Sequence, residues 1–129
     1  MGKIEKISVI IPTYNSANFI EKTLESLISQ TVLPEEIIIV DDGSKDNTVE
    51  IINKWAQNKK SLNIKFKQNQ HKGPGEARNI GIHLSTGDWI SFLDSDDTWE
   101  PKKIYEVKKI IRNNINVNFI THYEYFINN

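Results

Sequence analysis

Two short apolar runs, each followed by a helical pattern, constrain the fold of this chain most strongly. The first run is Ile7-Ser8-Val9-Ile10-Ile11, ended by Pro12, and the second is Glu36-Ile37-Ile38-Ile39-Val40, ended by Asp41. Runs of this kind are typical of strands that are buried on both faces of a parallel sheet. Apolar residues at helical spacing follow both runs, over residues 19–28 and 49–56. The pattern therefore predicts repeated strand–loop–helix units.

The rest of the chain continues this alternation. Residues 62–66 alternate between apolar and polar side chains, which predicts a half-exposed strand at or near a sheet edge. A glycine-rich turn then leads into a short helix, the run at residues 89–93 predicts another strand, and residues 117–127 predict a last one. A helix is expected between these last two strands, with Thr98 and Pro101 at its start and an inner face of Ile104, Val107 and Ile111. Five strands alternating with four helices predict a single α/β domain with a mostly parallel, Rossmann-like sheet flanked by helices.

Composition and charge exclude several functional classes. The chain has 129 residues, of which 38% are apolar, so it is long enough for one domain with a genuine core. A net charge of −1 gives no global field that would favour nucleic acid or an anionic membrane. The absence of cysteine excludes disulfides, thiolate metal sites and a cysteine nucleophile. With no apolar run of membrane-spanning length and no signal-like start, a cytoplasmic location is the default expectation.

Polar loops follow three of the expected strands. They cover residues 12–16, 41–44 and 94–97. Each has a structural explanation on its own: Asn15 and Ser16 as helix caps, Asp42-Gly43 as a turn, and Asp94 as a solvated loop residue. In an open α/β sheet, however, ligands bind beyond the carboxyl ends of the strands. The coincidence of three such loops at one sheet edge therefore predicts a binding cleft.

Three carboxylates crowd the last of these loops. Asp94, Asp96 and Asp97 occupy three of four successive positions, and like charges this close repel one another unless a cation or hydrogen-bond donors gather them. Oxygen ligands on a short loop suit Mg²⁺ or Mn²⁺, which proteins commonly hold with one or two carboxylates plus substrate phosphates. The alternative is a polar turn after a buried strand.

The chemistry of the other polar groups suggests a nucleotide. The ring of Tyr14 could stack on a heterocyclic base, and Asp41 could accept a base N–H. Arg78 could brace the base pocket or a phosphate, and a surface arginine of its helix is the less favoured alternative. The three histidines are scattered without zinc-binding spacing, so we interpret them as structural or surface residues.

Four ordered motifs resemble the nucleotide-binding half of family 2 glycosyltransferases with the GT-A fold. They are Ser8-Val9-Ile10-Ile11-Pro12-Thr13-Tyr14-Asn15, Ile39-Val40-Asp41-Asp42-Gly43-Ser44, Gly75-Glu76-Ala77-Arg78-Asn79-Ile80-Gly81 and Phe92-Leu93-Asp94-Ser95-Asp96-Asp97. The resemblance implies that the residues in contact with the donor are Pro12, Tyr14, Asp41, Arg78, Asp94 and Ser95. It also implies that Asp96 and Asp97 bind the metal, Mg²⁺ or Mn²⁺.

The same resemblance implies a reaction. A sugar would pass from a nucleotide-diphosphate sugar, typically a UDP-sugar, to a hydroxyl of a sugar or lipid-linked acceptor, with inversion and with help from the metal. Family members continue into an acceptor-binding half that holds the general base, whereas this sequence stops at Asn129. We therefore expect residues 1–129 to be the donor-binding part of a truncated domain, inactive or weakly active alone and without a catalytic base. Missing regions or partners could place it at the inner membrane face.

Two other interpretations remain open at this point. Residues 90–98 also fit the Asp-x-Asp-x-Thr pattern of haloacid-dehalogenase-like phosphatases, with Asp94 as nucleophile and Asp96 as acid/base. Only 31 residues follow Thr98, too few for the later motifs of that fold. A non-catalytic nucleotide-binding module is the second alternative. A nicotinamide-binding domain is weaker, because Pro12-Thr13-Tyr14 stands where a glycine-rich turn would be expected.

Overall fold

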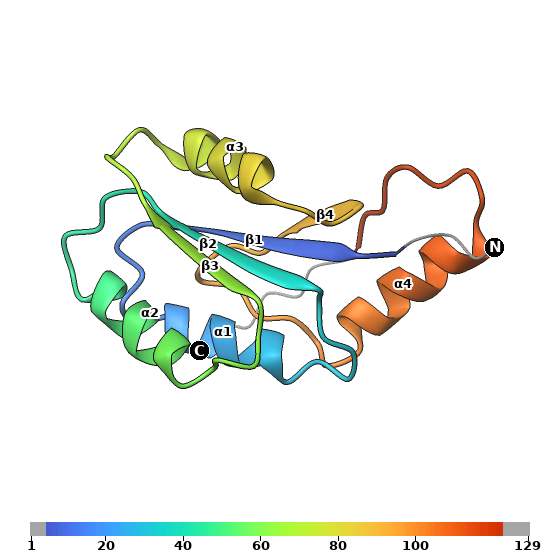
Figure 1. Ribbon diagram of the computed structural model, residues 1–129, viewed down its shortest axis with the longest axis horizontal. Helices are drawn as coiled ribbons and strands as arrows, with labels where there is room; N and C mark the ends of the chain where they lie inside the picture. Colours follow the sequence, from blue (N-terminus) through green and yellow to red (C-terminus); the bar gives the residue numbers. More distant parts are fainter. Residues whose placement is uncertain (1–4, 123–129) are drawn as a thin grey trace.

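A single parallel sheet forms the centre of the molecule (Figure 1). The computed structural model describes residues 5–122. Its strands are β1 (Ile7–Thr13), β2 (Glu36–Asp41), β3 (Ile64–Gln68) and β4 (Trp89–Phe92), and they lie in the order β3-β2-β1-β4. All three neighbouring pairs are parallel. The predicted α/β class with a parallel sheet is therefore confirmed.

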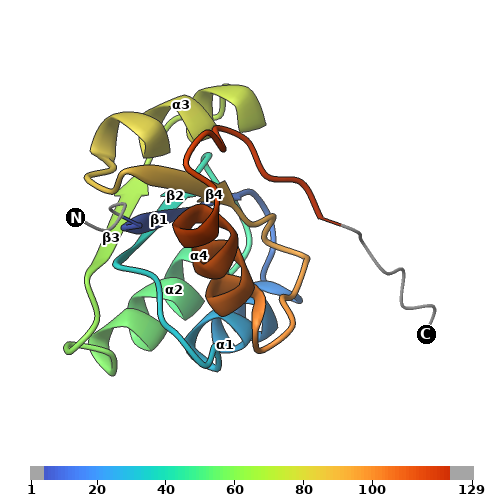
Figure 2. The same cartoon turned by 90° about the vertical axis from the view of Figure 1, so that its right-hand side faces the viewer.

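Helices cover both faces of this sheet. They are α1 (Ile20–Ile28), α2 (Thr48–Gln57), α3 (Pro74–Leu84) and α4 (Lys103–Asn113). The helix α3 lies on one face and the other three lie on the opposite face, where α1 packs beside α2 (Figures 1 and 2). The side chain of Gln30, just after α1, donates to the carbonyl of Glu100 and accepts from the backbone N–H of Ile104, which joins the end of α1 to the start of α4.

The strands β1 and β2 are buried along their whole length, as their continuous apolar runs predicted. Because side chains alternate across a strand, each run feeds two cores. The larger core lies towards α1, α2 and α4 and contains Val9, Ile11 and Ile39, whereas the smaller core lies towards α3 and contains Ile10 and Ile38. β3 is an edge strand with intermediate and exposed residues, which confirms the interpretation of its alternating pattern.

The close packing of α3 on β1 requires glycine at position 81. A Cβ added there would lie 2.4 Å from Cγ2 of Ile10. The glycine therefore lets the helix approach the sheet, and it fixes the distance between Arg78, one turn earlier on α3, and the end of β1.

Two expected elements differ from the structure. Residues 117–122 form no strand, and residues 123–127 lie outside the described residues. The aromatic residues that suggested this strand, Tyr123, Tyr125 and Phe126, are among the residues that the structure does not describe. In the described part, Phe119 is 80% exposed and so contributes no buried face. In addition, α4 begins at Lys103, after Thr98 and Pro101, although Ile104 and Ile111 of its expected inner face are buried as predicted.

A buried carboxylate joins the strands at the end of the sheet where β2 begins. Glu36 is 2% exposed. Its Oε1 accepts hydrogen bonds from Ser8 Oγ at 2.6 Å and from the backbone N–H of Thr86, and its Oε2 lies 2.8 Å from Nζ of Lys65. Burial alone would raise the pKa of Glu36, but the contacts with Lys65, Ser8 and Thr86 outweigh burial and lower this pKa from 4.5 to about 2.

We expect this carboxylate to make folding sensitive to acid. Because the pKa of Glu36 is lower in the folded state, its contribution to stability is present above pH 4.5 and is lost as the pH falls from 4.5 towards 2. The full contribution is about 3 kcal/mol. Urea unfolding of Glu36→Gln at pH 7, 4 and 3 should show a lower free energy of unfolding at pH 7 and a smaller loss on acidification than in the unchanged protein. Glu50→Gln, an exposed position on α2, is the matched control, and an equal acid loss in Glu36→Gln would contradict the expectation.

Candidate functional site

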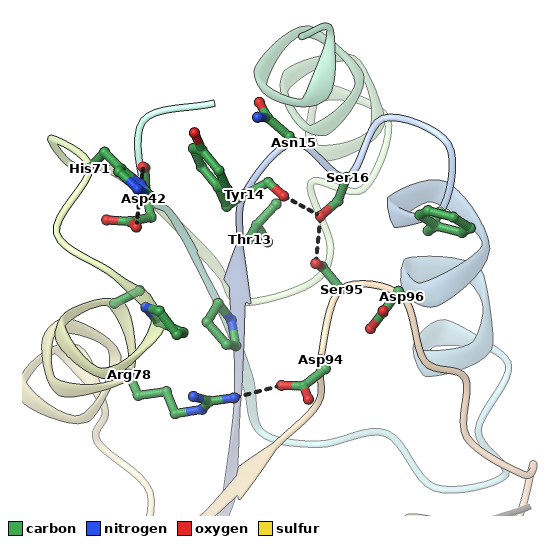
Figure 3. A pocket seen from close by; sticks show the side chains of 14 residues that line it. Thr13, Tyr14, Asn15, Ser16, Asp42, His71, Arg78, Asp94, Ser95 and Asp96 are labelled. Carbon is green, nitrogen blue, oxygen red and sulfur yellow. Dashed lines mark hydrogen bonds and ion pairs between the residues drawn. The ribbon is translucent and has the colours of Figure 1, made fainter. Parts of the chain in front are cut away.

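A pocket of about 390 Å³ lies at the carboxyl ends of β1, β2 and β4 (Figure 3). The helix α3 and the loop between β1 and α1 complete its walls. The residues that line it are Pro12, Thr13, Tyr14, Asn15, Ser16, Phe19, Asp42, His71, Pro74, Ala77, Arg78, Asp94, Ser95 and Asp96. The predicted cleft at this sheet edge is therefore present, and it contains Pro12, Tyr14, Arg78, Asp94, Ser95 and Asp96 from the predicted site.

The loop after β1 is tied to its neighbours through Asn15 and Ser16, the two residues that the sequence suggested as helix caps. Asn15 has a positive φ of 46°, its backbone N–H donates to Ser44 Oγ, and its Oδ1 accepts from the N–H of Lys45, both at 2.8 Å. The N–H of Ser16 donates to Thr48 Oγ1 at 2.8 Å. Neither side chain caps α1, which begins only at Ile20. These bonds instead fix the backbone that follows Tyr14, a residue that is 41% exposed.

Asp41 lies beside the pocket and does not line it. Its residue is 1% exposed, and its carboxylate accepts hydrogen bonds from Gly43 N–H at 3.1 Å, Ser44 N–H at 2.9 Å and Ser44 Oγ at 2.5 Å. Gly43 has a φ of +81°, and a Cβ there would lie 2.9 Å from the backbone nitrogen of His71. In this structure Asp41 therefore shapes the turn after β2, and its contact with a base stays a prediction.

Asp42 is the carboxylate that lines the pocket from this strand end, and it was not among the predicted site residues. It is 2% exposed, and its Oδ1 and Oδ2 accept hydrogen bonds from the N–H groups of Lys72 and Gly73 at 2.8 and 2.9 Å. Nδ1 of His71 lies 2.9 Å from Oδ2. A charged group this deeply buried is stable because donors surround it, so Asp42 fixes the loop between β3 and α3.

His71 was also missed, because the histidines were tested only for zinc-binding spacing. Its ring stacks on that of Tyr14, with centroids 4.2 Å apart and planes inclined by 25° (Figure 3). The signal available in the sequence was its position just beyond the third expected strand, at the same sheet edge as the three polar loops. The two rings form one wall of the pocket.

Arg78 reaches across the pocket from α3 to the end of β4. Its Nη2 donates to Asp94 Oδ1 at 2.8 Å, and its guanidinium carbon lies 5.9 Å from the ring centroid of Phe92. The two side chains are 34% and 51% exposed, and an ion pair this open contributes little to stability. Both groups are therefore accessible to a ligand.

The acidic loop after β4 is held by hydroxyl groups. Ser16 Oγ and Ser95 Oγ share a hydrogen bond of 2.6 Å, and Thr23 Oγ1 donates to the carbonyl of Ser95 at 3.0 Å. Asp96 lines the pocket, whereas Asp97 is exposed outside the lining and donates its backbone N–H to the carbonyl of Asp94 at 3.1 Å. The hydroxyl contacts of Ser95 thus fix the position of the loop.

The donor set of this loop fits a hard divalent cation only in part. Within residues 5–122, no three aspartate, glutamate or histidine side chains are arranged to hold a metal ion. Asp94 and Asp96 line the pocket and could supply carboxylate oxygens, which suits Mg²⁺ or Mn²⁺ when phosphate oxygens and waters complete the shell. In the same described range, none of the helices is long and apolar enough to cross a membrane.

The fold and the pocket define a class: an α/β domain that presents a partly charged ligand pocket at the carboxyl ends of parallel strands. Over residues 8–129 the sequence matches the model of the family described as "Glycosyl transferase family 2". The chain belongs to this glycosyltransferase family. Membership replaces the phosphatase interpretation of Asp94 and Asp96 and confirms the resemblance seen in the motifs.

Named relatives and solved structures agree with this assignment. The chain is 46% identical over 101 residues to the Escherichia coli UDP-Glc:alpha-D-GlcNAc-diphosphoundecaprenol beta-1,3-glucosyltransferase WfaP, covering 78% of this chain and 39% of the relative. Among structures, S. aureus TarS 1-349 in complex with UDP-GlcNAc superposes with a TM-score of 0.75 at 35% identity, covering 84% of this chain and 31% of TarS.

A second solved structure, the mannosyltransferase PcManGT from Pyrobaculum calidifontis in complex with GDP-Man and Mn²⁺, has a TM-score of 0.76 at 27% identity. This likeness covers 84% of the chain and 33% of PcManGT. The chain spans between 10% and 39% of the length of eight curated relatives that it matches.

We expect Asp42→Asn to loosen the loop between β3 and α3. The amide side chain keeps one oxygen acceptor, so one buried N–H donor loses its partner, at a cost of about 1–3 kcal/mol. Hydrogen exchange followed by NMR should show faster exchange at the amides of Lys72 and Gly73, with a lower unfolding temperature. Asp88→Asn, at an exposed position before β4, is the control, and unchanged exchange at both amides in Asp42→Asn would contradict the assignment.

Proposed function

We propose that these residues form the donor site of a glycosyltransferase that moves a sugar from a nucleotide-diphosphate sugar to an acceptor hydroxyl. The observation that carries the proposal is that parts of all four family motifs meet at one pocket: Pro12 and Tyr14, Asp42, Arg78, and Asp94 with Asp96. In an open α/β sheet this edge is the ligand-binding edge.

The two ends of the pocket suggest how the donor lies. Tyr14 and His71 offer aromatic surface at one end, which suits a nucleoside base, while Arg78, Asp94 and Asp96 gather charge at the other. We propose that the base lies over the rings and that the diphosphate lies towards Asp94 and Asp96. Uracil is the base that we favour, because TarS was solved with UDP-GlcNAc and WfaP is named for UDP-Glc.

Asp41 can take part in this arrangement without losing its present contacts. An ionised carboxylate offers about four lone-pair sites, and Asp41 uses three of them on Gly43 and Ser44. We propose that it accepts a base N–H with its remaining capacity. Pro12, at the end of β1, would present its backbone to the base, and Ser95 would contribute by keeping the acidic loop against the pocket.

Asp96, with Asp97 beside it, would hold Mg²⁺ or Mn²⁺ at the diphosphate. When bound, such an ion neutralises the charge that develops on the departing diphosphate. The PcManGT complex, which holds GDP-Man and Mn²⁺, supports this part of the proposal. Asp94 would keep Arg78 in reach of the donor through their 2.8 Å ion pair.

We further propose that residues 1–129 are the donor-binding part of a longer transferase. The greater length of the relatives supports this division. The acceptor site and the general base would belong to the remainder, the acceptor would be a sugar or a lipid-linked sugar, and transfer would invert the anomeric carbon. The name of WfaP, which includes a diphosphoundecaprenol acceptor, supports the lipid-linked choice.

Calorimetric titration with UDP tests the proposal on this chain. We expect UDP to bind in the presence of Mn²⁺ and to bind at least about 10-fold more weakly in EDTA, because the carboxylates then repel the diphosphate. Asp96→Asn should lower the affinity measured in Mn²⁺ towards the EDTA value, whereas the control Asp88→Asn should not. Absence of UDP binding under both conditions would contradict the proposed donor site, and equal affinity with and without Mn²⁺ would contradict the metal.

A further inference from the structure

His71 is the pocket residue whose contacts the family motifs do not account for. It precedes the glycine-rich turn and lies outside the four motifs on which the resemblance is based. Its side chain is 57% exposed, yet its ring is stacked on Tyr14 at a centroid distance of 4.2 Å. An exposed imidazole in such a defined position needs something to hold it there.

Asp42 provides that hold. Nδ1 of His71 lies 2.9 Å from Asp42 Oδ2 and 3.2 Å from the backbone oxygen of the same residue, so the ring N–H can donate to either. The side chain of Asp42 is 3% exposed and also accepts the backbone N–H groups of the two residues after His71. The imidazole is therefore fixed through both its ring and its backbone to the end of β2.

We propose that His71 is a positioning residue of the donor site, which holds the ring of Tyr14 in place to receive the nucleoside base. This inference rests on the proposed function of the pocket. Two successive side-chain contacts, from Asp42 to His71 and from His71 to Tyr14, link the end of β2, the loop before α3 and the loop after β1 (Figure 3). These contacts lie at the aromatic end of the pocket. A ring that is already ordered loses less side-chain freedom when a base stacks on it, and this strengthens binding.

Loss of His71 should weaken binding of the base and leave binding of the diphosphate unchanged. The reason is that the ion pair of His71 with Asp42 shares no residue with the ion pair of Arg78 with Asp94. Titrations with UDP and with inorganic pyrophosphate, both in Mn²⁺, separate the two. For His71→Ala we expect the Kd of UDP to rise by about 5-fold or more, the lower end of the range for loss of base–aromatic stacking. The Kd of pyrophosphate should stay within about 2-fold of that of the unchanged protein, because pyrophosphate has no base to stack on Tyr14.

Two further variants separate the ring of His71 from its polar contact. His71→Phe keeps a ring against Tyr14 but lacks the Nδ1 contact with Asp42, so it should recover only part of the UDP affinity. His71→Asn keeps a donor for Asp42 without the ring and should recover less than His71→Phe. His83→Asn is the matched control, because His83 is an exposed histidine on α3 that contacts the carbonyl of Asn79. A ligand-free measurement accompanies them: the His71 ring protons should be shifted upfield by Tyr14 in NMR spectra and should lose this shift in Tyr14→Leu.

The outcomes distinguish this inference from the proposed function. Absence of UDP binding by the unchanged protein overturns both. UDP binding that is equal or tighter in His71→Ala overturns the inference alone, since His71 would then be irrelevant or would occupy the place of the base. An equal loss of UDP and pyrophosphate affinity also overturns it, because the effect would then be a general disturbance of the pocket.

Discussion

The arrangement of the site depends on the pairing of β1 with parallel neighbours on both sides. Because β2 and β4 run in the same direction as β1, their carboxyl ends meet at one edge, and residues more than 80 positions apart become neighbours there. The register brings Ile10 opposite Phe92 and Thr13 opposite Asp41, so the loops after these three strands must contact one another. The pocket is the space that these loops and α3 leave between them.

Two successive buried carboxylates then give this edge its shape. Burying a charge is costly unless donors surround it, and both Asp41 and Asp42 are surrounded by donors. Asp41 accepts hydrogen bonds from the turn that leads to α2, whereas Asp42 accepts hydrogen bonds from the loop that leads to α3. Asp42 thus orders the loop that carries His71, whereas the turn held by Asp41 supports the loop that carries Tyr14 through the bond from Asn15 N–H to Ser44 Oγ. The stacked rings of Tyr14 and His71 join these two loops.

The sequence was sufficient for the class of fold and the place of the pocket, because continuous burial and strand direction both follow from local patterns. The fully buried β1 and β2, the edge strand β3 and the meeting of three polar loops were predicted and are present. The strand expected from residue 117 is absent up to residue 122, because apolar and aromatic content does not show whether a segment has a neighbouring strand to pair with. Asp41 is held by residues two and three positions further on, whereas Asp42 accepts from the N–H of Lys72, 30 positions away. The roles of Asp42 and His71 depend on such long-range contacts, which no local pattern encodes.

The two ends of the pocket differ in how firmly they are held, and this difference suits a donor that meets a cation. At the aromatic end, His71 is tied to a carboxylate that is 3% exposed, so its position is determined before any ligand arrives. At the acidic end, the Arg78–Asp94 pair is open to solvent, where water competes with the ion pair, while the loop itself is held through the backbone and the hydroxyl of Ser95. A base can therefore find an ordered surface, whereas phosphate oxygens and a metal ion can rearrange the acidic side chains around themselves at little cost.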